Sequence, residues 1–180
     1  MHYSLCDMVL DLFQNSVEAN SKTITLDFIQ DKSFLEVNLT DDGKGMDEST
    51  LDRVKDPFYT DGIKHKNRRV GLGIPFLIQT TEMTDGSFHL KSVLGEGTAL
   101  SATFNLNHWD TPPIGGITDL LISCLSFDGE YEFIFNREDR ERKLSYTITR
   151  SELLDVLGDL TLVTNMILLK EFIESQELDN

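Results

Sequence analysis

The chain has 180 residues, of which 39% are apolar, so it is long enough to bury one core and to carry an appended element. Its formal net charge of −15 opposes docking on polyphosphate, which excludes nucleic acid as an expected partner. No stretch reaches the roughly 18 to 20 apolar residues that cross a bilayer, and no targeting segment opens the chain, so we expect a cytoplasmic protein with no membrane partner.

The first predicted element is a helix from about residue 3 to residue 20. Apolar residues recur in it at helical spacing: Leu5, Met8, Val9, Leu12 and Val17. Asp7, Asp11 and Asn15 follow one another at every fourth position and therefore share a second, polar face. An asparagine there can give one oxygen to Mg²⁺ while a carboxylate one turn earlier orients a water. Asn15 and Asp11 fit these roles, and a plain polar helix surface fits the same pattern.

Two alternating runs, around residues 24–28 and 35–39, predict a β-hairpin. Its second strand leads directly to Asp41, which is followed by Gly43 and Gly45. The Asp41 carboxylate could accept a hydrogen bond from an exocyclic amine such as that of adenine, while the glycines let the backbone approach a flat base. An aspartate before a glycine is also an ordinary turn.

A loop from about residue 52 to 70 separates this hairpin from a predicted helix near residues 74–83. Four cationic residues gather in the loop: Lys64, Lys66, Arg68 and Arg69. A solvated loop and a cationic lid that closes over phosphates both fit this cluster. Gly71 and Gly73 open the helix, where free backbone N–H groups and the helix dipole favour phosphate binding.

Two more strands are expected, around residues 88–92 and 98–106, with Gly95–Thr98 between them as a turn or a further binding loop. The predicted elements give an α+β fold. We expect a two-layer α/β sandwich with a mixed, mostly antiparallel sheet, helices on one face, and a small C-terminal α/β appendage.

Four segments, in this order and spacing, resemble the motifs of the GHKL ATPase superfamily, which includes DNA gyrase B, Hsp90, histidine kinases and MutL. They are the N-box Leu12–Ala19 and the three glycine boxes Asp41–Met46, Gly71–Ile74 and Gly95–Thr98. Asp56–Thr60 is similar to the phenylalanine box of bacterial histidine kinases. The resemblance covers about residues 5–106 and implies a Bergerat-type fold.

The resemblance implies ATP as cofactor, Mg²⁺ held by Asn15, adenine read by Asp41, and an ATP lid from Phe58 to Val70. It implies a nucleotide-contacting set: Asn15, Ala19, Asp41, Gly43, Gly45, Met46, Phe58, Lys64, Gly71, Leu72, Gly73 and Thr98. Asp11 takes the place of the catalytic carboxylate, which is usually Glu in hydrolytic members. Because Asp is one methylene shorter, catalytic turnover stays open.

Residues 108–116 are rich in Pro and Gly and predict a linker between an ATP-binding domain, 1–107, and an extension, 117–180. The extension is expected to contain a helix from Ile117, a hairpin at 131–135 and 144–148, Ser151 as an N-cap, a terminal helix over 163–173 and an acidic solvated tail. The apolar terminal helix either packs on its own chain or forms an interface with a partner or a second copy of the chain. Cys6 and Cys124 lie in apolar stretches, so we expect buried thiols in a reducing compartment.

Ten residues precede Asp11, and none of the chain's four histidines is followed by the acidic residue and Thr-Pro of a phosphoacceptor helix. We therefore expect a histidine-kinase-like domain that lacks its own phosphoacceptor and acts as a kinase, ATPase or nucleotide-dependent switch on an unidentified partner protein. A non-catalytic ATP-binding module is the alternative. A DNA repair ATPase of the MutL kind ranks last because it conflicts with the charge.

Overall fold

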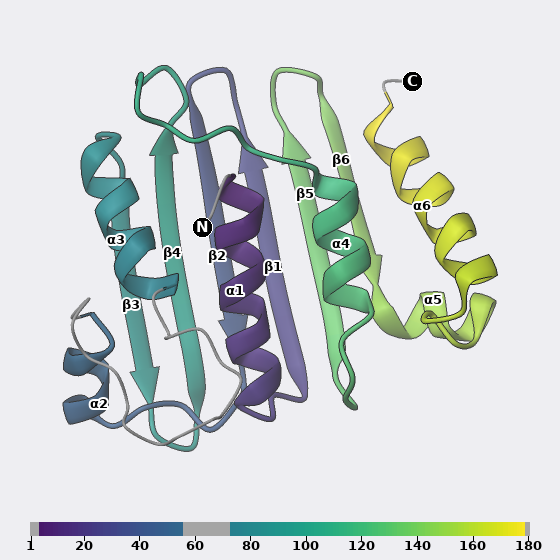
Figure 1. Ribbon diagram of the computed structural model, residues 1–180, viewed down its shortest axis with the longest axis horizontal. Coiled ribbons are helices and arrows are strands. Elements are labelled where there is room, and N and C mark those ends of the chain that lie inside the picture. The colour runs from purple at the N-terminus through teal and green to yellow at the C-terminus, as the bar shows by residue number, and fades with distance from the viewer. Residues whose placement is uncertain (1–3, 56–72, 179–180) are drawn as a thin grey trace.

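The computed structural model describes residues 4–55 and 73–178, and these form one six-stranded sheet with a layer of helices (Figure 1). The strand order is β3-β4-β2-β1-β5-β6. The strands are β1 Thr23–Gln30, β2 Phe34–Asp41, β3 Ser87–Val93, β4 Gly97–Asn105, β5 Glu132–Asp139 and β6 Leu144–Thr149. All neighbours are antiparallel except β1 and β5, which run parallel. The predicted α+β class and the mostly antiparallel sheet are confirmed.

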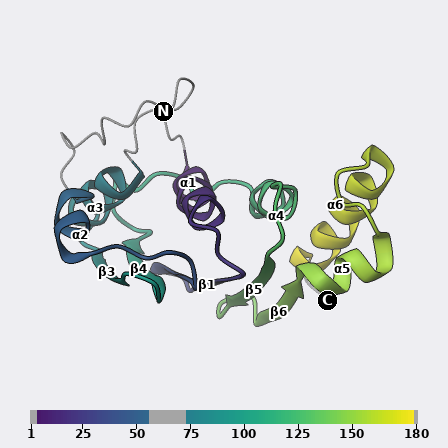
Figure 2. The same ribbon diagram turned by 90° about the horizontal axis from the view of Figure 1, so that it is seen from below.

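Six helices accompany the sheet in the described residues: α1 Leu5–Glu18, α2 Glu48–Arg53, α3 Gly73–Met83, α4 Ile117–Leu125, α5 Arg150–Leu157 and α6 Val163–Glu177. Figure 2 shows α1, α3 and α4 on one face of the sheet, with α6 beyond α4 at the end of the row. The short helix α2 was not predicted. It begins where the Asp47 side chain accepts a hydrogen bond from the Thr50 N–H. No described helix is both long enough and apolar enough to cross a membrane.

The hydrophobic core lies between the sheet and the helices, and Phe13 of α1 is fully buried in it. The ring centroid of Phe13 lies 4.6 Å from that of Phe133 on β5, and about 6 Å from those of Tyr131 and Phe127. The edge-to-face geometry with Phe133 is favourable because it places the positive ring edge against the negative ring face. The segment predicted as an extension therefore contributes β5 and its aromatic side chains to the core around α1.

The start of α1 is held by its own side chains and by the segment predicted as a linker. Ser4 and Asp7 form a reciprocal capping box, in which each side chain accepts from the other residue's backbone N–H. The next N–H groups, of Leu5 and Cys6, donate to the carbonyl oxygens of Pro113 and Ile114 at 2.9 and 2.8 Å. The backbone donors of the first helical turn that have no partner within the helix are thus satisfied by the connection between β4 and α4.

Two expectations for the C-terminal part are wrong. Ser151 is not an N-cap, because β6 runs directly into α5 and the Ser151 N–H donates to the Glu132 carboxylate. The acidic tail was expected from Glu171, but residues 171–177 belong to α6, which continues to Glu177. Glu177 accepts hydrogen bonds from Arg137 on β5 and from Tyr146 on β6, and these bonds hold the last turn of α6 against the sheet.

Arg137 is the centre of a buried polar cluster between the sheet and α6. Its guanidinium donates to Glu177 at 3.1 Å, to Asp139 at 3.2 Å and to the Gln30 side chain at 2.9 Å. Its side chain is 1% exposed, which makes it a fully desolvated cation. Burial and the hydrogen bond to Glu177 raise the pKa of Tyr146, so this phenol stays protonated. Because the cation is matched by two carboxylates and an amide, its burial is tolerated.

Both cysteines are free and buried, as expected. Burial raises the pKa of the Cys6 thiol to about 12, and burial also raises that of Cys124. Both thiols therefore stay protonated at neutral pH and are poor nucleophiles.

We predict that Arg137→Met costs about 3 kcal/mol or more of unfolding free energy, because it leaves the buried Asp139 without its cation and leaves Glu177 with Arg142 alone. Urea denaturation followed by circular dichroism measures this. Arg140→Met is the matched control: Arg140 pairs with Glu138 at 2.8 Å, but both side chains are about half exposed, so little change is expected. Equal losses for the two variants would contradict the prediction.

Candidate functional site

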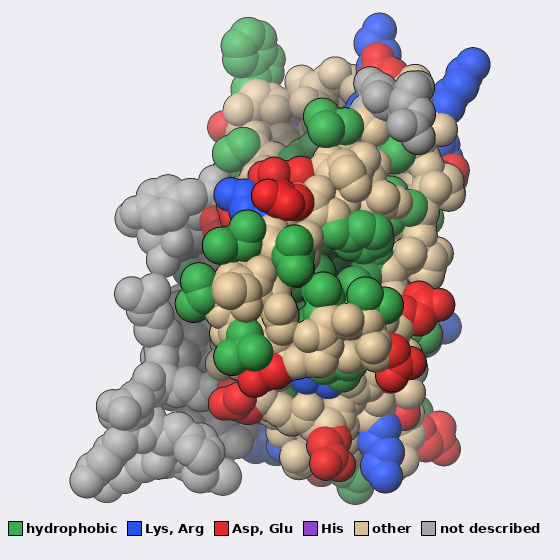
Figure 3. Space-filling model, turned by 90° about the vertical axis from the view of Figure 1, so that its right-hand side faces the viewer, with side chains coloured by type: hydrophobic (Ala, Val, Ile, Leu, Met, Phe, Trp, Pro, Cys, Tyr) green, Lys and Arg blue, Asp and Glu red, His purple; other side chains and the backbone are tan. Residues whose placement is uncertain are grey.

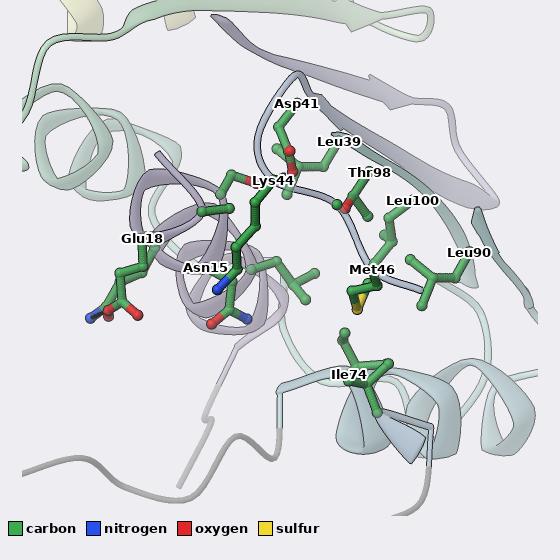
Figure 4. A pocket seen from close by; sticks show the side chains of 16 residues that line it. Asn15, Glu18, Leu39, Asp41, Lys44, Met46, Ile74, Leu90, Thr98 and Leu100 are labelled. Carbon is green, nitrogen blue, oxygen red and sulfur yellow. Dashed lines mark hydrogen bonds between the residues drawn. The ribbon is translucent and has the colours of Figure 1, made fainter. Parts of the chain in front are cut away.

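A cavity of about 850 Å³ opens at the end of the sheet where β2 finishes (Figure 4). Its walls come from α1, β2, the loop after β2, β3, β4 and the first turn of α3. This volume lies in the range of about 300–1,000 Å³ that small-molecule sites occupy. The cavity is therefore large enough for a nucleotide-sized ligand.

The cavity has an apolar wall and a polar end. Leu39, Leu90, Leu100, Met46 and Ile74 form the apolar wall. Asn15, Glu18 and Lys44 form the polar end. Asp41, at the end of β2, and Thr98, at the start of β4, also line the cavity (Figure 4). Such a division suits a ligand that has a flat apolar group at one end and charge at the other.

Asp41 is the buried carboxylate of the site, with 8% of its surface exposed. Its Oδ2 accepts a hydrogen bond from the Ser16 hydroxyl at 2.7 Å, and its Oδ1 accepts from the Gly43 N–H at 2.9 Å. These two donors fix the orientation of the carboxylate. Each oxygen retains a second lone pair, so Asp41 can accept a further bond from a ligand in the cavity.

The strand register brings the predicted segments together at Asp41. Asp41 on β2 lies opposite Thr98 on β4, and Thr98 in turn lies opposite Ser92 on β3. The Ser92 hydroxyl accepts from the Met46 N–H at 2.9 Å and lies 2.9 Å from the Gly97 carbonyl oxygen and 3.0 Å from the Thr98 hydroxyl. Sequence reasoning missed Ser92, because nothing but its register opposite Thr98 distinguishes it from any polar strand residue.

Three glycines allow the loops around Asp41 to pack closely. Gly45 has φ +60° and Gly97 has φ +106°, both in the left-handed region. A Cβ at Gly45 would lie 1.9 Å from the Val93 carbonyl oxygen, and one at Gly97 would lie 2.0 Å from that of Asp41. A Cβ at Gly43 would approach the Asp41 carboxylate to 3.0 Å. Side chains at these positions would displace the carboxylate or the strand ends that hold it.

The polar face of α1 places Asn15 in the cavity lining and Asp11 one turn earlier. Asp11 does not line the cavity, but it lies beside the start of α3. A Cβ at Gly73, the first residue of α3, would be 3.5 Å from the Cβ of Asp11. The positive end of the α3 dipole therefore lies near the Asp11–Asn15 face, which favours negative charge there.

Lys44 also lines the cavity, and sequence reasoning missed it because a lysine between two glycines looks like an ordinary loop residue. Its N–H donates to the Ala19 carbonyl oxygen at 3.0 Å, and its own carbonyl oxygen accepts from the Gly95 N–H at 2.8 Å. Figure 4 shows its side chain extending toward Asn15. Among residues 4–55 and 73–178, no carboxylate forms an ion pair with it.

The predicted site residues fall into three groups. Those that line the cavity are Asn15, Ala19, Asp41, Gly45, Met46 and Thr98. Gly43 and Gly73 are buried next to lining residues, and Asp11 neighbours Gly73. Phe58, Lys64, Gly71 and Leu72, with the rest of the expected lid, lie outside the described residues.

No group of three or more His, Cys, Asp or Glu that could hold a metal occurs in the part of the chain that the structure describes. Asn15 lines the cavity, and its amide oxygen could serve as one ligand of a metal there, with water and the bound molecule supplying the other ligands. This donor set fits Mg²⁺, which keeps several waters and binds phosphate oxygens.

Comparison with known proteins identifies sensor and sporulation kinases as relatives. The chain is 30% identical over 102 residues to sporulation kinase A of Bacillus subtilis, and 25% identical over 104 residues to sporulation kinase C of the same organism. These alignments cover 56% and 57% of this chain. They cover 16% and 23% of the two kinases, so the matched part of the chain spans less than a quarter of the length of either.

The crystal structure of the N-terminal domain of a DNA repair protein has a similar fold, with a TM-score of 0.53 and 14% identity. The match covers 91% of this chain and 58% of that one. Residues 3–108 match the family described as histidine kinase-, DNA gyrase B- and HSP90-like ATPases, as the sequence motifs predicted. With more than half of its length matched and the corresponding fold around the cavity, the chain belongs to this ATPase family.

Proposed function

We propose that the chain binds ATP together with Mg²⁺ in the cavity between α1 and the strand ends, and that nucleotide binding serves the action of a kinase, ATPase or switch on a partner protein. ATP binding is the shared property of the family. The observation that carries the proposal is the buried Asp41 carboxylate. Ser16 and Gly43 hold it in the lining of the cavity, which also includes the apolar wall.

The arrangement around Asp41 suits adenine. The apolar side chains of Leu39, Leu90 and Leu100 offer a surface for a flat base, and the carboxylate accepts a hydrogen bond from its exocyclic amine. Guanine has a carbonyl oxygen where adenine has this amine, and that oxygen would face the carboxylate without a proton between them. We therefore expect adenine nucleotides to bind more tightly than guanine nucleotides.

The phosphates would lie at the polar end of the cavity. Asn15 would hold Mg²⁺ through its amide oxygen, and the Lys44 ammonium, which extends toward Asn15, would contact phosphate oxygens (Figure 4). Bound Mg²⁺ would offset negative charge on the phosphates. Asp11, next to the start of α3, would orient an attacking water or an acceptor group.

After ATP binding, the step that we propose is phosphoryl transfer to a partner protein. Two of the relatives that align to this chain are sporulation kinases by name, which supports phosphoryl transfer to a partner protein. A non-catalytic ATP-binding module is the alternative, because Asp11 is a short carboxylate for positioning water. The net charge of −15 disfavours a DNA repair role.

We also propose a cytoplasmic location, with which the buried free thiols Cys6 and Cys124 agree.

We predict that a non-hydrolysable ATP analogue binds the wild type with Mg²⁺, and that Asp41→Asn weakens binding by tenfold or more, since a bond to a charged acceptor contributes about 1.5–3 kcal/mol. Asn15→Ala should weaken binding only when Mg²⁺ is present. Isothermal titration calorimetry measures both. Asp128→Asn and Asn107→Ala, at exposed positions outside the cavity lining, are the controls. A folded wild type that binds no nucleotide would refute the proposal.

For Lys44 we predict a selective effect on charged ligands. Lys44→Met should weaken binding of the ATP analogue and of ADP by about tenfold while leaving adenosine unchanged, because adenosine carries no phosphate. Lys32→Met, at an exposed position in the β1–β2 turn, is the control for losing one positive charge. An equal loss for all three ligands would instead assign Lys44 a role in the shape of the cavity.

Asp11→Asn separates the enzyme from the binding module. If Asp11 orients the attacking group, this variant should release phosphate at least about 100-fold more slowly while it binds the ATP analogue like the wild type. Phosphate release with and without candidate partner proteins is the measurement. Wild-type protein that binds ATP and releases or transfers no phosphate under any of these conditions would favour the module.

A further inference from the structure

An exposed apolar surface lies on α5 and α6, at the opposite end of the sheet from β3. Six residues with 42–81% of their surface exposed make up this α5–α6 surface: Val156, Leu162, Val163, Ile167, Leu168 and Phe172. Figure 3 shows apolar side chains gathered on this side of the molecule, with acidic side chains around them. The surface lies wholly beyond residue 108, where the family match ends.

The spacing along α6 indicates a helix that needs cover on two sides. Leu169 and Ile173 are fully buried, on the side where α6 contacts α4. Leu168 and Phe172 each precede one of these buried residues and are 51% and 42% exposed. A surface helix usually has one apolar stripe and a polar outer face. In α6 the second stripe has the i, i+4 spacing that a packed helix presents to another helix.

A groove of about 290 Å³ runs beside this stripe, between β6, α5 and α6. Its apolar lining includes Ile148 of β6, Leu153 and Leu157 of α5, and Leu168 and Phe172 of α6. The groove offers a recess for apolar side chains that project from a second element. An apolar stripe next to a recess is the arrangement that binds the apolar face of an amphipathic helix.

The charges around the α5–α6 surface select the kind of partner. Five exposed carboxylates lie on α5, α6 and their connection: Glu152, Asp155, Asp159, Glu171 and Glu174. The cations of α5 and α6 are already engaged. Lys170 pairs with Glu174 at 3.8 Å, and the Arg150 guanidinium lies over the Tyr131 ring and donates to its carbonyl oxygen. A second copy of the chain would bring carboxylates against carboxylates, whereas a basic segment would be attracted.

We propose that the α5–α6 surface is a docking site for an amphipathic helix of a partner protein that carries apolar side chains on one face and Lys or Arg along its borders. The apolar face covers Ile167, Leu168 and Phe172 and inserts side chains into the groove. The basic borders meet Glu152 and Glu171. The site is separate from the nucleotide cavity and does not depend on its function.

The test uses the full chain and a dye-labelled synthetic helix built from Leu on one face and Lys on the other, with a Leu and Glu peptide for comparison. Fluorescence anisotropy should detect binding of the Leu/Lys peptide and no binding of the Leu/Glu peptide. Leu168→Glu and Val163→Glu should each weaken it by tenfold or more. Met83→Glu, at a 52% exposed position on α3, should leave it unchanged. High salt should weaken binding because it screens the carboxylates.

The variants separate docking from general charge attraction, because each adds a carboxylate. If the peptide were held by the chain's net charge alone, Leu168→Glu would bind it as well as or better than the wild type, and this result would overturn the proposal. Equal binding of the Leu/Glu peptide would also overturn it. Sedimentation velocity tests whether a second copy of the chain covers the surface instead. A wild-type dimer that Val163→Glu dissociates would assign the surface to that second copy and overturn the proposal.

Discussion

The orientation of α1 about its own axis is the constraint on which the site depends. A helix can turn its polar face in any direction until one side is packed. In this chain the packed side of α1 includes Phe13, which lies among the rings of Phe133 and Tyr131. With Phe13 turned toward the sheet, Asn15 lies in the cavity lining and Asp11 lies beside the start of α3. Phe133 of β5 and Tyr131, which directly precedes this strand, therefore help to position Asn15 and Asp11 of α1.

Asp41 joins this helix to the sheet. Ser16 of α1 donates to one carboxylate oxygen and the loop glycine Gly43 donates to the other, so a shift of either element would disturb the carboxylate. The turn between β3 and β4 is held in the same place because Ser92 bonds to Met46 and Gly97 packs on the Asp41 backbone. Three segments, α1, the loop after β2 and the β3–β4 turn, thus support one acceptor, which is the preorganisation that the proposed adenine contact requires.

The second half of the chain completes the core and also carries the exposed α5–α6 surface. It completes the core around α1 through β5, and it holds α6 against the sheet through the buried Arg137 cluster. Arg137 holds the C-terminal end of α6, and α4 packs against the buried side of α6. The exposed apolar side of α6 therefore belongs to a helix that is fixed to the rest of the fold. The same element that closes the fold can therefore present a surface to another molecule, well away from the cavity beside Asp41.

The sequence by itself determined the class of fold, the family and most of the candidate site, because its signals are local. Helical spacing placed Asp11 and Asn15 on one face, strand alternation led to Asp41, and glycines marked the loops at Gly45 and Gly97. The tertiary structure alone decided that β5 runs parallel to β1, that Ser92 lies beside Thr98, that Lys44 enters the cavity, and that α6 extends to Glu177. Each of these depends on strand register or on packing between residues far apart in the chain, and neither leaves a periodic pattern in the sequence.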